Sequence, residues 1–324
     1  MKGHKKKTVD LSKYGYIFIA PFFLIFIVFQ LYPLIYTFYK SFYYSTFTRF
    51  GSIEHFGLEN YKKYIGTEKE FWWAVAITVG LWLLNFVPQI LLSLLLAAWF
   101  TDVKYKLKHD GKYKVIMYMP NIITAATIAV LFYKMFNNNG PMTEIMRKLG
   151  MVKAEHYVLE KGWATFFIIA FIQFWMWYGN TMIVLCAGIM GISPSLYEAA
   201  MVDGATSRQQ FFKITVPLLK PILQFTLVTS AIGGLQMYDI PYLFNDGGPI
   251  INIGKEHVSS TQTVVMLIKK FIFADKPDHG RAAAYSVVLF FITLAVSMVF
   301  YIATSEKKEK KPKNNAKNAE VVEG

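Results

Sequence analysis

The sequence predicts an all-α integral membrane protein with six transmembrane helices. Of its 324 residues, 54% are hydrophobic and only 17% are charged, whereas about a quarter of the residues of a typical soluble domain are charged. The apolar residues are gathered into six long blocks, and many of the charged residues lie in short clusters. A hydrocarbon core of ~30 Å requires about 20 apolar residues in a helix, and each block is long enough.

Each block is expected to be helical, because lipid offers no hydrogen-bond partner for unpaired backbone groups. Prolines at positions 21, 33, 88 and 120 lie in or near the blocks. Membrane helices tolerate proline when neighbouring groups satisfy the freed carbonyls, so kinks rather than breaks are expected. In chain order, the predicted spans are Tyr14–Tyr36, Trp72–Phe100, Val115–Phe136, Trp163–Met190, Ile222–Phe244 and Ala282–Thr304.

The first block follows the basic stretch MKGHKKK, so a secretory signal peptide is an alternative to a retained span. Its apolar region is too long for a signal peptide, and no A-x-A-like cleavage site follows it. We therefore interpret it as the first span. The single cysteine, Cys186, lies inside the fourth block, so an intrachain disulfide is excluded and the redox compartment stays open.

The distribution of Lys and Arg predicts that both termini are cytoplasmic, because cytoplasmic loops carry an excess of these residues. The net charge of +13 is then explained by topology signals that face anionic lipid, and nucleic-acid binding is not expected. The expected organisation is a cytoplasmic N-terminal segment over 1–13, a six-span domain over 14–304 and a disordered basic cytoplasmic tail over 305–324.

A polar island over residues 191–220 separates the fourth and fifth spans and is predicted to face the cytoplasm. Ser193 followed by Pro194 offers a helix N-cap with proline at the first helical position. Ser195 with Glu198 offers a competing capping box.

The island is expected to contain two short helices. Gly204 supplies the left-handed residue at which the first helix ends, and Ser207 with Gln210 opens the second. The loop is either an ordered turn between two spans or a device that transmits motion from a soluble partner.

The same loop carries the residues of a known signature. Glu198-Ala199-Ala200 is followed by three residues and Gly204, and then by nine residues, Ile214 and Val216-Pro217. This pattern resembles the EAA motif of permease subunits of binding-protein-dependent ATP-binding cassette (ABC) importers, with valine where leucine is usual.

The resemblance extends over almost the whole chain apart from its termini. The stretches YIFIAPFFLIFIVFQLYPLIYTFYKSF and MYMPNIITAATIAVLFYKMFNNNGPMTEIMRKLG resemble the first and third spans of the maltose-type carbohydrate permeases. The stretch LQMYDIPYLFNDGGPI resembles the start of their outer loop, with its Gly-Gly-Pro.

The resemblance implies a type I ABC importer permease fold in the bacterial plasma membrane, and a role as permease subunit of a sugar importer, in particular an oligosaccharide importer. In that family two six-span permeases, usually different chains, form one translocation pathway. Two cytoplasmic ATPase subunits dock on the EAA loops, and an extracytoplasmic binding protein delivers the sugar. The residues that it assigns to the coupling helix or its end are Glu198, Ala199, Ala200, Asp203 and Gly204.

The chain has no Walker A loop. The closest stretch, Gly248 to Lys255, is one residue too long, and Glu256 stands where Ser or Thr must hold magnesium. ATP hydrolysis is therefore expected from a separate subunit, and the chain itself is expected to be a transport subunit without enzymatic activity or cofactor. Its six histidines are scattered, and no metal site is expected.

Carbohydrate sites combine aromatic faces with a few fixed polar groups in an otherwise apolar concavity. The fourth and fifth predicted spans offer both kinds, and Asp239 is the only acidic residue within any predicted span. A charge inside the membrane indicates function by default. Alternatively, Asp239 pairs with a basic loop residue, and the Trp and Tyr residues form an interfacial belt. The pathway candidates are Gln173, Trp177, Asn180, Gln236, Tyr238 and Asp239, with Trp175, Tyr178 and Tyr242 nearby.

The alternative function is that of a stand-alone secondary carrier or channel for a small polar solute. Such proteins normally show internal repeats and several buried ionisable groups, and this sequence shows neither. A membrane enzyme would need a catalytic constellation in a loop, which the sequence does not offer either.

Overall fold

The computed structural model describes residues 12–48, 51–102, 108–153, 155–253 and 256–305. This part of the chain is predominantly helical, and four of its helices are long and apolar enough to cross a membrane. Two further helix pairs, each bent at a short break, bring the number of candidate spans to as many as six. The expected all-α membrane architecture is confirmed, while the expected terminal segments lie almost entirely outside the described residues.

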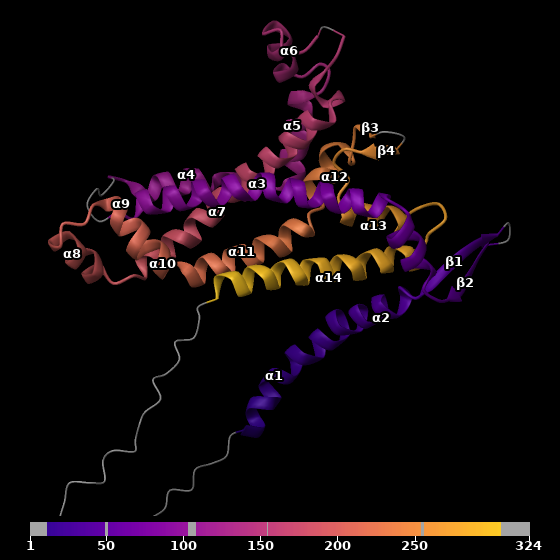
Figure 1. Ribbon diagram of the computed structural model, residues 1–324, viewed down its shortest axis with the longest axis horizontal. Helices are drawn as coiled ribbons and strands as arrows, with labels where there is room; N and C mark the ends of the chain where they lie inside the picture. The colour runs from indigo at the N-terminus through magenta and orange to yellow at the C-terminus, as the bar shows by residue number, and fades with distance from the viewer. Residues whose placement is uncertain (1–11, 49–50, 103–107, 154, 254–255, 306–324) are drawn as a thin grey trace, which may run out of the picture.

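The first span consists of α1 (Ser12–Phe26), the π-helical turn η1 (Ile27–Leu31) and α2 (Tyr32–Lys40). Pro21 lies within α1 without breaking it, as expected. Figure 1 shows this span leaving the bundle at an angle, with α1 apart from the other helices. Its contact with the bundle includes Phe38 of α2, whose ring packs edge-on against Phe290 and Phe291 of α14.

The core forms where α3 (Glu70–Phe100) packs along α7 (Gly162–Met190). α11 (Lys220–Leu235) and α14 (His279–Thr304) lie beside this pair (Figure 1). Pro88 lies within α3, which continues through it. Because lipid is as apolar as the core side chains, close van der Waals packing holds these helices together. Fully buried core side chains include Leu81, Ile169, Ile172, Met182 and Leu185.

The third predicted span is broken, not kinked. α4 (Asp110–Ile122) and the helix that starts with α5 (Ala125–Phe136) meet at 84°, and Figure 1 shows α5 rising away from the bundle. Ile123 and Thr124 have extended backbones, and the Thr124 side chain accepts from the Thr127 N–H as the N-cap of α5. An N-cap oxygen satisfies a backbone donor that has no partner within the helix, which makes this break stable and corrects the expectation of a kink.

The fifth predicted span is also discontinuous. α11 ends at Leu235, residues 236–238 are not helical, and α12 (Asp239–Asn245) follows. The hydroxyl of Thr263 donates to the Met237 carbonyl at 2.8 Å, so the freed backbone oxygen is paired. Such irregular backbone is tolerated at membrane depth where it is buried in protein or lines a cavity.

The remaining elements lie between the spans. Two antiparallel hairpins, β1 with β2 and β3 with β4, accompany the helices. The bounds are β1 Tyr43–Thr48, β2 Gly51–Phe56, η2 Asn60–Thr67, α6 Pro141–Lys148, η3 Val158–Glu160, α8 Pro194–Val202, α9 Ser207–Gln210, η4 Phe211–Thr215, α10 Val216–Leu218, β3 Ile250–Ile253, β4 Glu256–Ser259 and α13 Val264–Ile272.

An ion cluster joins the beginning of α3 to α13 and α14. The Arg281 Nη2 lies 2.7 Å from a Glu68 carboxylate oxygen and 3.0 Å from one of Glu70. The guanidinium also lies between the rings of Tyr64 and Phe271, at 4.0 and 3.9 Å from their centroids. A planar guanidinium suits simultaneous pairing and stacking, so this cluster fixes α13 beside the bundle.

Two glycines let helices approach to backbone contact. A Cβ at Gly179 of α7 would lie 2.2 Å from the Met117 carbonyl oxygen of α4, and a Cβ at Gly234 of α11 would lie 2.0 Å from the Trp82 ring. Small residues allow such close approach in membrane helix bundles.

We expect Gly179→Ala to lower the stability of the bundle by about 1–3 kcal/mol, because an added methyl group forces α4 away from α7. Gly15→Ala is the matched control, since nothing lies within 4 Å of a Cβ there and alanine favours a helix. Thermal unfolding of the detergent-solubilised variants should show a lower midpoint for Gly179→Ala alone. Equal midpoints would contradict the packing described.

Candidate functional site

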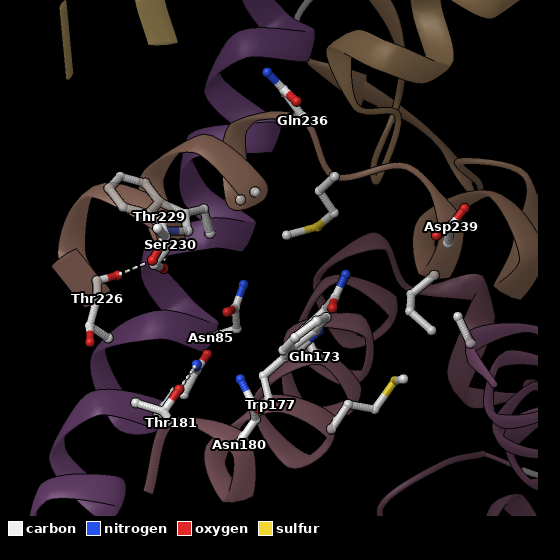
Figure 2. Close-up of a pocket in the computed structure, with 18 of the residues that line it drawn as sticks. Asn85, Gln173, Trp177, Asn180, Thr181, Thr226, Thr229, Ser230, Gln236 and Asp239 are labelled. Carbon is white, nitrogen blue, oxygen red and sulfur yellow. Dashed lines mark hydrogen bonds between the residues drawn. The ribbon is translucent and has the colours of Figure 1, made fainter. Parts of the chain in front are cut away.

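A pocket of about 470 Å³ lies between α3, α7 and α11, at the place where the fifth span breaks. Figure 2 shows amide and hydroxyl side chains from these helices pointing toward a common space. Among the described residues that line the pocket, Asp239 is the one that carries a charge. Fixed polar groups in a concavity with apolar and aromatic walls are typical of a small-molecule site.

One wall of the pocket comes from α7. Gln173, Trp177, Asn180 and Thr181 follow one another at helical spacing, so they share a face of the helix. Gln173 is buried, while the Trp177 side chain is 46% exposed and available for contact. This wall therefore offers two amides, a hydroxyl and an indole face.

A second wall comes from α3, through Asn85 and Gln89, which lie one turn apart and are both buried. The Gln89 Nε2 donates to the Thr181 Oγ1 at 2.8 Å and bridges the α3 and α7 walls. The Asn85 Nδ2 donates to the Leu81 carbonyl at 2.7 Å. These bonds fix the orientation of both amides within the pocket.

The third wall is a row of hydroxyl groups on α11. Thr226 and Thr229 donate to carbonyls one turn earlier, each at 2.8 Å, and Ser230 accepts from the Trp82 indole N–H at 3.1 Å. Because the two threonine protons are committed to the backbone, those oxygens remain as acceptors for a ligand.

The break in the fifth span forms the rim of the pocket, through Gln236, Tyr238 and Asp239. Lys269 of α13 donates to the Tyr238 hydroxyl and lies 3.8 Å from the ring centroid of Tyr242. The hydrogen bond to Tyr238 raises the pKa of Lys269, so this ammonium stays charged at neutral pH. Asp239 is exposed, and no basic residue in the described ranges pairs with it.

The structure brings all six pathway candidates into this one pocket: Gln173, Trp177, Asn180, Gln236, Tyr238 and Asp239. Trp175, Tyr178 and Tyr242 are not among the lining residues; Trp175 packs against Phe132, and Tyr178 donates to the Met117 sulfur. Sequence reasoning missed the walls from α3 and α11. The signal was present, because two amides four residues apart in an apolar helix must share one face. The missed residues are Asn85, Gln89, Thr226, Thr229 and Ser230.

At the end of the bundle away from α13, α8 and α9 form the loop between the fourth and fifth spans (Figure 1). Ser193 precedes α8 and Pro194 is its first residue, as one of the two expected starts required, but the Ser193 side chain makes no capping hydrogen bond. The expected capping box of Ser195 and Glu198 is wrong. Ser195 already lies in the first turn, and its hydroxyl bonds to that of Ser193 at 2.8 Å.

The end of α8 is closed by Gly204, whose φ is 78°. The Gly204 N–H donates to Met201 and the Ala205 N–H donates to Ala200, a pair of bonds that defines a Schellman motif. Of the EAA residues Glu198, Ala199 and Ala200, the first two are exposed and the third is half-buried, while Asp203 is exposed.

The second helix of the loop, α9, begins at Ser207, but its capping box uses other residues than expected. Thr206 accepts from the Gln209 N–H, and the Gln209 side chain accepts from the Thr206 N–H. The predicted pair of Ser207 and Gln210 is therefore displaced by one residue, because the N-cap lies just before the first helical residue.

No group of three or more potential metal ligands occurs among the described residues. The His156 Nδ1 lies 2.7 Å from a Glu160 carboxylate oxygen, and no third His, Cys, Asp or Glu among the described residues joins this pair to form a metal site. Lys255, in the stretch closest to a Walker A loop, lies outside the described residues.

Residues 64–310 match the family described as binding-protein-dependent transport system inner membrane component, and the chain belongs to this family. The lactose transport system permease protein LacF of Rhizobium radiobacter is 30% identical over 94% of this chain and 97% of the relative. The trehalose/maltose transport system permease protein MalF of Thermococcus litoralis is 28% identical over 89% of this chain and 92% of the relative. The resemblance to carbohydrate permeases inferred from the sequence is thus confirmed.

The fold is similar to that of a solved ABC importer. The crystal structure of a bacterial ABC transporter involved in the import of the acidic polysaccharide alginate matches with a TM-score of 0.70 and 20% identity, covering 91% of this chain and 96% of that one. The expected type I ABC importer permease fold is confirmed.

If solvent reaches the pocket, a cysteine in its wall should react with a small polar thiol reagent. In a Cys186→Ser background we expect Asn180→Cys to be labelled rapidly. Ile172→Cys should resist labelling, because Ile172 lies on the same helix with none of its surface exposed. Mass spectrometry of the purified variants reads both, and equal protection of the two positions would contradict an open pocket.

Proposed function

We propose that this chain is the permease subunit of an ATP-driven importer of sugars, in particular oligosaccharides, and that it forms half of the translocation pathway. The observation that carries the proposal is the lining of the pocket, which combines amides and hydroxyls with the rings of Trp177 and Tyr238. Such a lining can hydrogen-bond the hydroxyls of a sugar and cover the apolar face of its ring. The relatives named for lactose, trehalose/maltose and arabinooligosaccharides support the same substrate class.

The importer would contain a second, different permease, an extracytoplasmic sugar-binding protein and two cytoplasmic ATPase subunits. The family name includes a binding protein, and the alginate transporter was crystallised with its periplasmic protein bound. A stand-alone carrier or channel is less well supported, because no feature of the pocket requires ion coupling and the family depends on a binding protein.

Coupling to the ATPases is proposed to run through α8. Its surface beyond the spans includes Glu198, Ala199, Asp203 and the 89% exposed Val202. Small and apolar residues rimmed by carboxylates suit a helix that enters a groove on a soluble partner. Figure 1 places α8 at the end of the bundle where α14 finishes, and the distribution of basic residues supports a cytoplasmic location for this end and for both termini.

Asp239→Asn tests the pathway, because it removes the single charge among the described lining residues. A hydrogen bond to a charged group is worth about 1.5–3 kcal/mol, so the KM for sugar uptake should rise about ten- to a hundredfold. Asp246→Asn is the matched control, since Asp246 lies outside the pocket lining and its φ of 51° suits asparagine. The readout is ATP-driven uptake of radiolabelled lactose, maltose and arabinooligosaccharides into vesicles that hold the assembled importer.

An unchanged KM in Asp239→Asn would remove this residue from the pathway. Wild-type vesicles that accumulate no sugar from a broad panel, with ATP and binding protein supplied, would overturn the proposed function itself.

Gly204→Asp separates a coupling helix from a simple turn. A non-glycine residue at a left-handed position costs ~1–2 kcal/mol, which a six-span bundle should absorb if the loop only connects. If α8 enters the ATPase, the added charge at its end should abolish most uptake at normal subunit abundance, and Glu198→Lys should act in the same direction. Gly150→Asp is the matched control, because Gly150 has a φ of 71° and equally open surroundings.

The measurements are uptake, subunit abundance and co-purification of the ATPase for all three variants. Normal uptake in Gly204→Asp and Glu198→Lys would refute the coupling role. The orientation has its own check: Arg208→Cys in the Cys186→Ser background should be labelled by an impermeant reagent only from the cytoplasmic side.

A further inference from the structure

Two side chains are buried within the helices of the α8–α10 loop. Tyr197 is the one buried residue of α8, with 9% of its surface exposed, and Thr215 at the end of η4 is 4% exposed. α9 and α10 contain no buried residue. The hydroxyls of Tyr197 and Thr215 form a hydrogen bond of 2.9 Å with each other. This buried hydrogen bond therefore connects α8 to η4 inside the loop.

This hydrogen bond fixes how α8 sits on the remainder of the loop. A buried hydroxyl left without a partner costs about 1–3 kcal/mol, so each of the two groups favours the arrangement that pairs it with the other. At its ends α8 is connected by non-helical residues, beginning with Ser193 on one side and Asp203 with Gly204 on the other. Without the bond, rotation of α8 about its own axis would be less strongly opposed.

Thr215 is connected to the helical core through Leu219. Its carbonyl accepts from the Leu219 N–H at 2.9 Å, and Leu219 is fully buried in the hydrophobic cluster that also contains Leu185 and Ile189 of α7. Gly188 permits this contact, because a Cβ there would lie 2.8 Å from a Leu219 methyl group. The chain bends by 65° at Leu219 and continues as α11.

The same two helices carry walls of the pocket. α11 begins at Lys220 and carries Thr226, Thr229 and Ser230 of the pocket. α7 carries Thr181 of the pocket about two turns before Gly188. A displacement of Thr215 and Leu219 would therefore reach the groups that line the pocket through these two helices.

We propose that the hydrogen bond between Tyr197 and Thr215 is the link by which α8 moves α11 and α7, which makes these two residues positioning residues for coupled transport. The proposal rests on the proposed function, since it assumes that α8 meets an ATPase. Neither side chain touches the substrate or the nucleotide. Through this bond, a displacement of α8 by the ATPase also displaces α7 and α11, which carry walls of the pocket.

The test measures sugar molecules imported per ATP hydrolysed in vesicles that hold the complete importer, with radiolabelled maltose and lactose as probes. Tyr197→Phe keeps the ring and removes the hydroxyl, and Thr215→Val does the same for its partner. Because one intramolecular hydrogen bond is worth about 0.5–1.5 kcal/mol, the ratio should fall about two- to tenfold in each variant. ATPase co-purification should stay normal, and Thr215→Ser, which keeps a hydroxyl, should keep the wild-type ratio.

Tyr61→Phe is the matched control. It removes a tyrosine hydroxyl that donates to Ser41 at 2.7 Å at the opposite end of the bundle, and it should leave the ratio unchanged. The ratio does not depend on how much importer is assembled, so a merely destabilised loop would lower abundance without lowering the ratio.

The double variant Tyr197→Phe with Thr215→Val should have a ratio of sugar imported to ATP hydrolysed no lower than that of the more impaired single variant, because both changes remove the same bond. A double variant whose loss is the product of the two single losses would overturn the link. An unchanged ratio in Tyr197→Phe with active wild-type importer would also overturn it and would leave the proposed function standing. Failure of the wild-type importer to take up any sugar would instead count against the proposed function, and the link would fall with it.

Discussion

The structure depends on one constraint: a peptide group inside a lipid bilayer must find its hydrogen-bond partner within the protein. Helices meet this requirement by themselves, and side chains supply partners for backbone groups at the breaks in the third and fifth predicted spans. At the break in the fifth span, Thr263 holds the Met237 carbonyl, while Thr78 accepts from the Val264 N–H at 3.0 Å. At the break in the third span, the Thr124 side chain accepts from the Thr127 N–H. The break in the fifth span supplies the rim of the pocket, Gln236, Tyr238 and Asp239.

The spans could be predicted from the sequence because apolar length is a local property, and α3, α7 and α14 appear close to their expected bounds. The breaks could not, because the group that stabilises the fifth span, Thr263, lies 26 residues beyond the carbonyl that it holds. Single polar residues within the predicted apolar spans, such as Asn180 and Gln236, could be picked out from the sequence, and they lie at the pocket. The walls from α3 and α11 depend on which helices become neighbours, which a single sequence does not state.

The pocket and the α8–α10 loop lie at different depths of the same bundle, and α7 and α11 reach both. Most groups that line the pocket are uncharged, and they are held by bonds within or between helices. The loop, in contrast, is largely exposed apart from Tyr197 and Thr215. The pocket and the exposed surface of the loop are thus built from different chemistry, and α7 and α11 connect them.

The ion cluster around Arg281 anchors the rim of the pocket to the remainder of the bundle. It ties α13 to the beginning of α3, and Lys270 adds an ion pair with Glu70 at 2.9 Å. Through Thr263, the residue that caps α13, the non-helical rim at residues 236–238 belongs to the same body. On one side of the pocket the rim is therefore held to α3 and α13, while the walls from α7 and α11 belong to the helices that lead to the α8–α10 loop. The separation between this rim and those walls, more than any one lining side chain, sets how wide a molecule the pocket admits.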